Sequence, residues 1–270
     1  MSWLAAVLLG VVQGLTEFLP VSSSAHLIFA RAFLGVDVEA AFGLAFDVAC
    51  HVGTLLATLW FFRVDVIAMI RAVPQALGPA PGPDGRRLRL IAVGTIPVVI
   101  AGTLFHHAIE ESMRTPIIAA TALLIGGVAF FVVERLGPRT KGEDRLSMLD
   151  VLVIGVAQAA ALIPGVSRSG ATIATGMALG MARETAARFT FLLSIPAIIG
   201  VAAKEGLDLR HASLSSSDLA LFAVGMVTSA VVGYAVVRFF LKFLGGHRLD
   251  VFGWYRVALA LIAFGWLVAH

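Results

Sequence analysis

The residues of this sequence that are best suited to chemistry lie in a short polar stretch at positions 164–172, which reads PGVSRSGAT. Arg168 stands there between two apolar segments, and an arginine in hydrocarbon costs at least about 2.5 kcal/mol unless it meets a partner or water. Hydroxyls and a glycine that lets backbone N–H groups approach a ligand surround it: Ser167, Ser169, Thr172 and Gly170. A guanidinium, hydroxyl donors and the N-terminus of a following helix are typical of an anion site. The alternative is a polar loop from which Arg168 only reaches the membrane surface.

A second polar stretch, at positions 17–26, carries a carboxylate, hydroxyls and an imidazole. Ser23 could attack a phosphorus atom, and His26 could act as base, acid or itself as nucleophile. Glu17 could bind a divalent cation that bridges phosphate oxygens, or it could orient the histidine. Taken singly, each has a simpler explanation, because the serine run 22–24 suits a helix N-cap and a lone histidine is often a core residue.

The composition is that of an integral membrane protein. Of the 270 residues, 59% are hydrophobic and 14% are charged, whereas soluble domains carry about 25% charged residues. The single cysteine, Cys50, excludes an intrachain disulfide and a cysteine cluster for zinc. The first residues lack the basic segment of a cleavable signal peptide. The formal net charge of +3 indicates little by itself, and we expect no nucleic-acid partner.

Hydrophobic segments of two lengths alternate with polar loops. Crossing a bilayer takes about 20 apolar residues, and six segments are long enough: 40–62, 90–108, 116–134, 184–204, 218–241 and 252–269. Shorter segments flank each polar stretch: 3–19 with 21–34, and 151–163 with 173–181. Such broken pairs indicate re-entrant helical hairpins. The proline- and glycine-rich basic loop at 74–89 is predicted to be irregular.

The distribution of lysine and arginine predicts the orientation. Three connections are rich in them: 63–89 (Arg63, Arg71, Arg86, Arg87, Arg89), 135–147 (Arg135, Arg139, Lys141, Arg145) and 238–256 (Arg238, Lys242, Arg248, Arg256). The intervening connections carry only Arg114, Lys204 and Arg210. By the positive-inside rule the rich connections are cytoplasmic and both termini face outward. The first hairpin would then enter the membrane from outside and the second from inside.

The two halves of the chain also resemble each other. A shift of 145 positions (158 − 13) superimposes the two hairpins, with Gln13 on Gln158, Ser22 on Ser167 and Ser24 on Ser169. A shift of 131 superimposes a later pair of segments, with Gly94 on Gly225. The predicted fold is therefore one all-α polytopic membrane domain over residues 1–270. It consists of two inverted repeats, about 1–140 and 146–270, each a re-entrant hairpin plus three transmembrane helices. Inverted repeats place their broken helices face to face near the membrane midplane.

Bringing the hairpins together assembles a set suited to phosphoryl transfer. Arg168 would bind phosphate oxygens in a bidentate manner, while Glu17, Ser23 and His26 supply a nucleophile and proton transfer. A transporter or flippase for a lipid phosphate is the rival reading, because inverted repeats are equally typical of secondary transporters. Transport would need the cation Arg168 but not a serine with a histidine.

The two polar stretches resemble a known family. Residues 12–26, VQGLTEFLPVSSSAH, and 164–173, PGVSRSGATI, are similar to the two signature motifs of the bacterial undecaprenyl-diphosphate phosphatases, the integral-membrane bacitracin-resistance proteins. The resemblance covers the whole chain. It implies dephosphorylation of undecaprenyl diphosphate to the monophosphate lipid carrier of cell-wall (peptidoglycan) synthesis, at a site that opens to the outer face of the bacterial plasma (inner) membrane. It also implies bacitracin resistance and the use of Mg²⁺ or Ca²⁺.

By position, the resemblance assigns catalysis to Glu17, Ser23, His26 and Arg168. It implies substrate contacts from the surrounding loop residues: Ser22, Ser24, Ser167, Ser169, Gly170 and Thr172. Glu17 and Gln13 would hold the metal, although many family members carry glutamate at position 13, so metal affinity stays open. Asp47 would play a supporting role behind the site; it shares a helix face with His51, four residues on. The sequence leaves open whether Ser23 or His26 attacks, whether the chain forms a homodimer, and which prenyl chain length fits.

Overall fold

The structure is a computed structural model of residues 1–270, and it describes all of them except 35–39, 137–138, 209–214 and 270. Arg210, which entered the count of basic residues above, lies outside the described residues. The described chain is helical, with no strand beyond one isolated bridge between Lys141 and Met181. An all-α fold was predicted, and the structure confirms it.

Six helices are long and apolar enough to cross a membrane. They are α3 (Ala40–Phe61), α6 (Pro83–Ala108), α7 (Pro116–Arg135), α10 (Arg183–Asp208), α11 (Ser216–Leu244) and α12 (Asp250–Ala269). Each coincides with one of the six segments predicted from hydropathy. A short π-helix, η1 (Ile109–Met113), connects α6 to α7, and a short 3₁₀ turn, η2 (Glu143–Arg145), precedes α8. The prediction of a multi-pass membrane protein is therefore confirmed.

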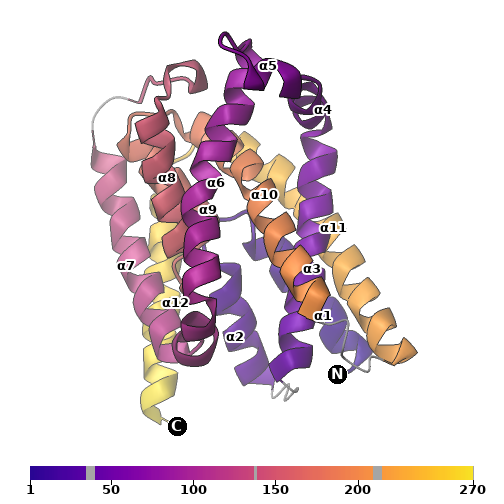
Figure 1. Ribbon diagram of the computed structural model, residues 1–270. Coiled ribbons are helices and arrows are strands. Elements are labelled where there is room, and N and C mark those ends of the chain that lie inside the picture. The colour runs from indigo at the N-terminus through magenta and orange to yellow at the C-terminus, as the bar shows by residue number, and fades with distance from the viewer. Residues whose placement is uncertain (35–39, 137–138, 209–214, 270) are drawn as a thin grey trace.

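Two pairs of short helices form the predicted hairpins. The first pair is α1 (Trp3–Thr16) with α2 (Ser23–Leu34), and the second is α8 (Met148–Ala160) with α9 (Arg168–Ala178). Figure 1 shows the first pair in the lower half of the bundle and the second in the upper half. At a rise of about 1.5 Å per residue, each helix is too short to cross a bilayer of about 30 Å. Each hairpin therefore turns back near the middle of the molecule.

The two turns share an unusual backbone conformation. Ser22 and Ser167 precede α2 and α9 with φ of 74° and 71°, and they are the only described non-glycine residues with positive φ. That region is strained for residues with a Cβ and is found where the surroundings enforce it. The Ser167 hydroxyl accepts the Gly170 N–H at 3.1 Å and so caps α9. Because of this cap, α9 begins at Arg168, five residues before the predicted segment 173–181.

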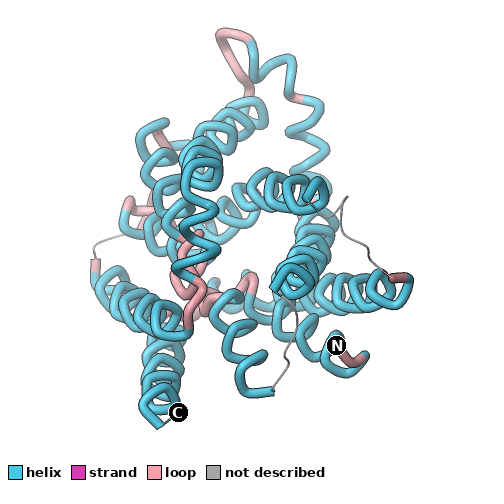
Figure 2. The backbone as a smooth tube through the Cα atoms, turned by 60° about the horizontal axis from the view of Figure 1, so that its bottom comes forward, coloured by secondary structure: helices cyan, strands magenta, loops and turns pink. Residues whose placement is uncertain are grey.

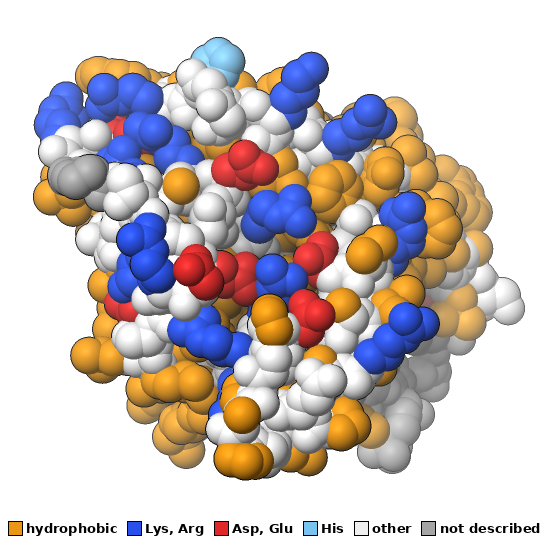
Figure 3. Space-filling model, turned by 90° about the horizontal axis from the view of Figure 1, so that it is seen from above, with side chains coloured by type: hydrophobic (Ala, Val, Ile, Leu, Met, Phe, Trp, Pro, Cys, Tyr) orange, Lys and Arg blue, Asp and Glu red, His pale blue; other side chains and the backbone are white. Residues whose placement is uncertain are grey.

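The loop predicted to be irregular at 74–89 is irregular at 78–82, as predicted, but it is helical on both sides of that segment, where the prediction was wrong. Helices α4 (Arg63–Arg71) and α5 (Val73–Leu77) follow α3, and α6 already begins at Pro83. The prolines did not prevent this, because Pro74 and Pro83 stand in the first turn of their helices, where a missing N–H costs nothing. This end of the molecule carries many Lys and Arg side chains interspersed with acidic ones (Figure 3).

Close packing between helices depends on glycines at corresponding places in the two halves. In α1, a Cβ on Gly10 would lie 2.9 Å from the carbonyl oxygen of Gly225 in α11. In α8, a Cβ on Gly155 would collide with the carbonyl oxygen of Gly94 in α6. Only glycine therefore allows the backbones to approach this closely. These four glycines are the ones that the two sequence shifts pair. The start of α1, near the N-terminus, and the end of α12, near the C-terminus, lie at the same end of the bundle (Figure 1).

Candidate active site

The two hairpin turns meet in the middle of the molecule and are bonded to each other. The Ser24 hydroxyl accepts the Gly165 N–H at 3.4 Å, and the Ser169 hydroxyl donates to the Leu19 carbonyl at 3.1 Å. In Figure 2 the loop segments, drawn in pink, come together among the helices. The sequence predicted that the hairpins assemble one site, and the structure does bring them together.

Arg256 of α12 holds the two hairpin turns in place. Its side chain is fully buried, and it donates to five backbone carbonyls: Pro20 at 3.2 Å, Gly165 at 2.9 Å, Val166 at 3.2 Å, Ala122 at 3.2 Å and Leu123 at 3.3 Å. It forms no ion pair with any described residue. The sequence count had placed it with the cytoplasmic arginines, which is wrong. Its position inside the segment 252–269 was the signal, because a buried arginine in a span needs partners.

The carboxylate of Glu17 is the centre of the predicted catalytic set. Its Oε2 accepts the Ser23 hydroxyl at 2.7 Å and the Gln13 amide at 3.0 Å. Its Oε1 lies 3.7 Å from a guanidinium nitrogen of Arg168. Residues from both hairpins thus converge on one buried carboxylate, and a hydroxyl points directly at it.

Arg168 is held loosely. Its pairing with Glu17, at 3.7 Å, exceeds hydrogen-bond length, and its buried Nη1 has no hydrogen-bond partner in the described structure. The side chain remains 23% exposed. A partly exposed arginine with an unused donor is suited to bind an anion.

His26 does not bond to Ser23, although the sequence placed the two together. Its Nδ1 lies 2.7 Å from the carbonyl oxygen of Ser22, and its Nε2 lies 2.7 Å from the hydroxyl of Tyr255. Because a carbonyl only accepts, Nδ1 carries the proton, and Nε2 accepts from the tyrosine. The two rings are also stacked at 5.6 Å. Tyr255 was missed, since no motif surrounds it in the sequence.

The remaining loop hydroxyls are used within the turns. Ser22 bonds to Ser24 at 3.2 Å, and Ser167 bonds to Ser169 at 3.3 Å. The Thr172 hydroxyl donates to the Arg168 carbonyl at 2.7 Å. Gly170 leaves room for Arg256, because a Cβ there would lie 3.1 Å from the guanidinium. These groups shape the turns, and their predicted contact with substrate stays a prediction.

Asp47 lies in a second layer behind Glu17. Its carboxylate accepts from Arg31 at 2.9 Å and from Arg114 at 3.3 Å. Its backbone carbonyl accepts from Nδ1 of His51 at 2.8 Å, and His51 Nε2 lies 3.5 Å from Glu17 Oε2. His51 therefore belongs to the site, which its position one turn after Asp47 could have suggested.

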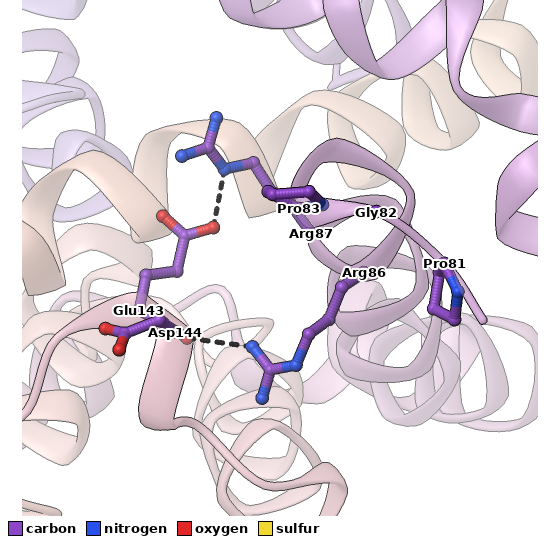
Figure 4. Close-up of a pocket in the computed structure, with 7 residues that line it drawn as sticks. All are labelled: Pro81, Gly82, Pro83, Arg86, Arg87, Glu143 and Asp144. Atoms are coloured by element: carbon purple, nitrogen blue, oxygen red, sulfur yellow. Dashed lines mark hydrogen bonds and ion pairs between the residues drawn. The ribbon is translucent and has the colours of Figure 1, made fainter.

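A cleft of about 350 Å³, separate from the central site, lies at the start of α6. It is lined in part by Arg86, Arg87 and Glu143. Arg87 donates to the Glu143 carboxylate at 2.6 Å, and Arg86 donates to the Glu143 carbonyl at 3.2 Å (Figure 4). Its cations are thus paired within the protein, and no nucleophile lines it. It is not the catalytic site.

The fold and this central site define a class: a membrane-embedded enzyme of phosphoryl transfer, with serine, carboxylate and arginine on two half-membrane hairpins. The model of the family described as bacitracin resistance protein BacA matches residues 6–262. This chain belongs to that family.

Curated relatives cover almost the full length. An undecaprenyl-diphosphatase of Rubrobacter xylanophilus is 44% identical, over 96% of both chains. Undecaprenyl-diphosphatase 2 of Stutzerimonas stutzeri is 44% identical, over 97% of both chains. The undecaprenyl-diphosphatase of Alcanivorax borkumensis is 41% identical, over 99% of this chain and 100% of the relative.

Proposed function

We propose that this protein hydrolyses undecaprenyl diphosphate to undecaprenyl phosphate and inorganic phosphate. The observation that carries the proposal is the 2.7 Å bond from the Ser23 hydroxyl to Glu17, opposite an arginine with an unused donor. Family membership and the printed names of the relatives support the substrate. The product is the lipid carrier of cell-wall synthesis, which the sequence resemblance also implied.

Ser23 is the nucleophile in this proposal. Glu17 takes the proton of the Ser23 hydroxyl while the oxygen attacks the terminal phosphorus. The bond to the bridging oxygen breaks, undecaprenyl phosphate leaves, and a phosphoserine remains. Water then cleaves the phosphoserine and releases phosphate. His26 is less suited to attack, because both of its ring nitrogens already have partners.

Arg168 and His26 divide the remaining tasks. Arg168 neutralises the charge on the terminal phosphate oxygens, where its free Nη1 finds the acceptor that it lacks. His26 Nε2 is its only basic nitrogen, because Nδ1 is bonded to the Ser22 carbonyl. Nε2 receives the proton of the attacking water once the Tyr255 hydroxyl turns from it to the water, and until then Tyr255 orients the ring.

A divalent cation, Mg²⁺ or Ca²⁺ in the sequence-based prediction, fits the residues at Glu17. No described group of three His, Cys, Asp or Glu side chains forms a metal site by itself. However, Mg²⁺ is commonly held by one or two carboxylates together with substrate phosphates. Oε1 of Gln13 is buried and has no hydrogen-bond partner. Glu17 and Gln13 would therefore hold the cation, which would supply charge neutralisation on the diphosphate.

We also propose the orientation and the repeat architecture. Both termini face the outside of the bacterial inner membrane, as the arginine-rich connections favour. The site opens outward, as the family resemblance implies. Two inverted repeats, about 1–140 and 146–270, are supported by the matching φ values of Ser22 and Ser167. Cysteine labelling tests the sidedness: a cysteine at Asp84 is expected to react only from the cytoplasmic side.

Phosphate release in detergent tests the function and excludes a transporter, because detergent leaves no second compartment. Purified protein with undecaprenyl diphosphate and Mg²⁺ should release phosphate, and Ser23→Ala should abolish it. Ser217→Ala, an exposed serine at the start of α11, is the matched control and should keep full activity. Folded protein that binds the lipid and releases no phosphate would contradict the proposal and favour the transporter.

A further inference from the structure

Among the described side chains, His51 is the one imidazole that faces the catalytic carboxylate. It lies on α3, with a side chain 20% exposed, and its Nε2 is 3.5 Å from Glu17 Oε2. Its other nitrogen, Nδ1, lies 2.8 Å from the Asp47 carbonyl oxygen. Because that carbonyl only accepts, Nδ1 carries a proton, and the lone pair of the neutral ring points from Nε2 towards Glu17.

The Glu17 carboxylate that His51 faces can only accept hydrogen bonds, so it offers no proton to the lone pair of Nε2. Glu17 Oε2 already accepts from Ser23 and from the Gln13 amide nitrogen. The oxygen of the same amide, Gln13 Oε1, is buried without a hydrogen-bond partner in the described structure. Gln13 itself is fully buried. An imidazole nitrogen and an amide oxygen thus lie beside the carboxylate with electron pairs that accept no hydrogen bond from the described residues.

The support behind His51 is typical of a metal ligand. Metal-binding histidines usually donate their second N–H to a carbonyl or carboxylate, which fixes the ring. Here the carbonyl is that of Asp47, whose carboxylate is in turn held by Arg31 and Arg114. This arrangement also gives Asp47 a role without direct contact to the substrate.

We propose that His51 binds the divalent cation through Nε2, together with Glu17 and Gln13 Oε1. Gln13 brings no negative charge, and the imidazole supplies a further ligand. Imidazole favours transition metals over Mg²⁺ and Ca²⁺, so this donor set should bind Co²⁺ more tightly than Mg²⁺, and Mn²⁺ serves as the spectroscopic probe. The inference rests on the proposed function only in that the cation serves the diphosphate site.

Mn²⁺ alone, added to purified protein, provides a readout independent of activity. Pulsed electron paramagnetic resonance should detect ¹⁴N modulation from a bound imidazole. His51→Ala should abolish that modulation and weaken Mn²⁺ binding by about tenfold or more. His247→Ala is the matched control, because His247 makes the same bond through Nδ1 to the carbonyl four residues earlier. Its modulation and affinity should equal those of the unchanged protein.

Further variants separate the other readings. The modulation should persist in His26→Ala, which excludes the second histidine of the site. Gln13→Glu should favour Mg²⁺ relative to Co²⁺. Bound Mn²⁺ without ¹⁴N modulation in the unchanged protein would overturn the inference and leave His51 as a protonated ion-pair partner of Glu17. That result leaves phosphate release intact, whereas loss of phosphate release from the unchanged protein would refute the proposed function.

Discussion

Two buried carboxylates, Glu134 and Glu17, show how differently this protein uses the same group. Glu134, at the end of α7, has no exposed side-chain surface. It accepts from Arg183 at 2.8 Å, from Arg139 at 3.2 Å and from the Leu249 N–H at 2.7 Å. The nitrogen atoms that face Glu17 across ion-pair distance stand further away, at 3.5 Å for His51 and 3.7 Å for Arg168. Its shortest bond is to a serine hydroxyl.

The difference separates structure from function. A carboxylate that accepts from two arginines and a backbone N–H at hydrogen-bond distance joins α7 to its neighbours, and removing it leaves those donors without their partner. A carboxylate whose charged and imidazole neighbours keep a gap leaves room for a phosphate or a metal ion between them. Mutating both residues should therefore change different quantities.

The largest expected effect is on catalysis at Glu17. Glu17→Gln should lower kcat for phosphate release by about 10³-fold or more, because the amide cannot accept the Ser23 proton. Ser23→Ala should lose as much, and the double variant should be scarcely worse than either, since the pair acts as one unit. Thermal unfolding should change little in each. Additive, modest losses in phosphate release would instead identify two binding residues.

The next effect is on stability at Glu134. Glu134→Gln should lower the free energy of unfolding by about 3 kcal/mol, because Arg139 and Arg183 lose a partner whose carboxylate is fully buried. The folded fraction should keep its specific activity. Asp84→Asn, at the same end of the molecule, is the control. Asp84 lies 3.9 Å from Arg87 and its side chain is 47% exposed, so the cost should stay below about 1 kcal/mol. Equal losses would remove the contrast. Denaturation in detergent measures both.

Arg168→Lys should lower kcat/KM by about 10²-fold. The lysine keeps the charge but loses the planar fork that binds two phosphate oxygens. Steady-state kinetics would measure this loss in kcat/KM. The control is Arg188→Lys, a change near the start of α10 and away from the site. Near-normal turnover of Arg168→Lys would show that a point charge is sufficient.

The smallest effect is expected at Tyr255. Tyr255→Phe removes the hydroxyl that lies 2.7 Å from His26 Nε2 but keeps the stacked ring. We expect about a tenfold loss in kcat with KM unchanged, because the ring of His26 is less well oriented. Tyr255→Leu should lose more. If kcat is unchanged in Tyr255→Phe, His26 does not depend on this bond.

The fold was largely predictable, because hydropathy and short broken segments report directly on membrane crossing. The membership of the site was also predictable for Glu17, Ser23 and Arg168. What could not be predicted was the pairing across the turns. Ser23 stands at the first position of α2, from which its hydroxyl reaches back across the turn to Glu17, and Tyr255 comes from the far end of the chain. The helix at 73–77 and the early start of α6 at Pro83 were missed because proline in a first turn resembles proline in a loop.

The assignment of Ser23 as nucleophile is tested most directly by trapping the phosphorylated enzyme. Purified protein is mixed with undecaprenyl diphosphate labelled in the terminal phosphate, quenched within one turnover and mapped by mass spectrometry. We expect acid-stable phosphate on Ser23, at a higher level in His26→Ala, where hydrolysis of the phosphoserine is slowed. Acid-labile phosphate on His26 would contradict the pairing of Ser23 with Glu17 and assign the attack to the histidine.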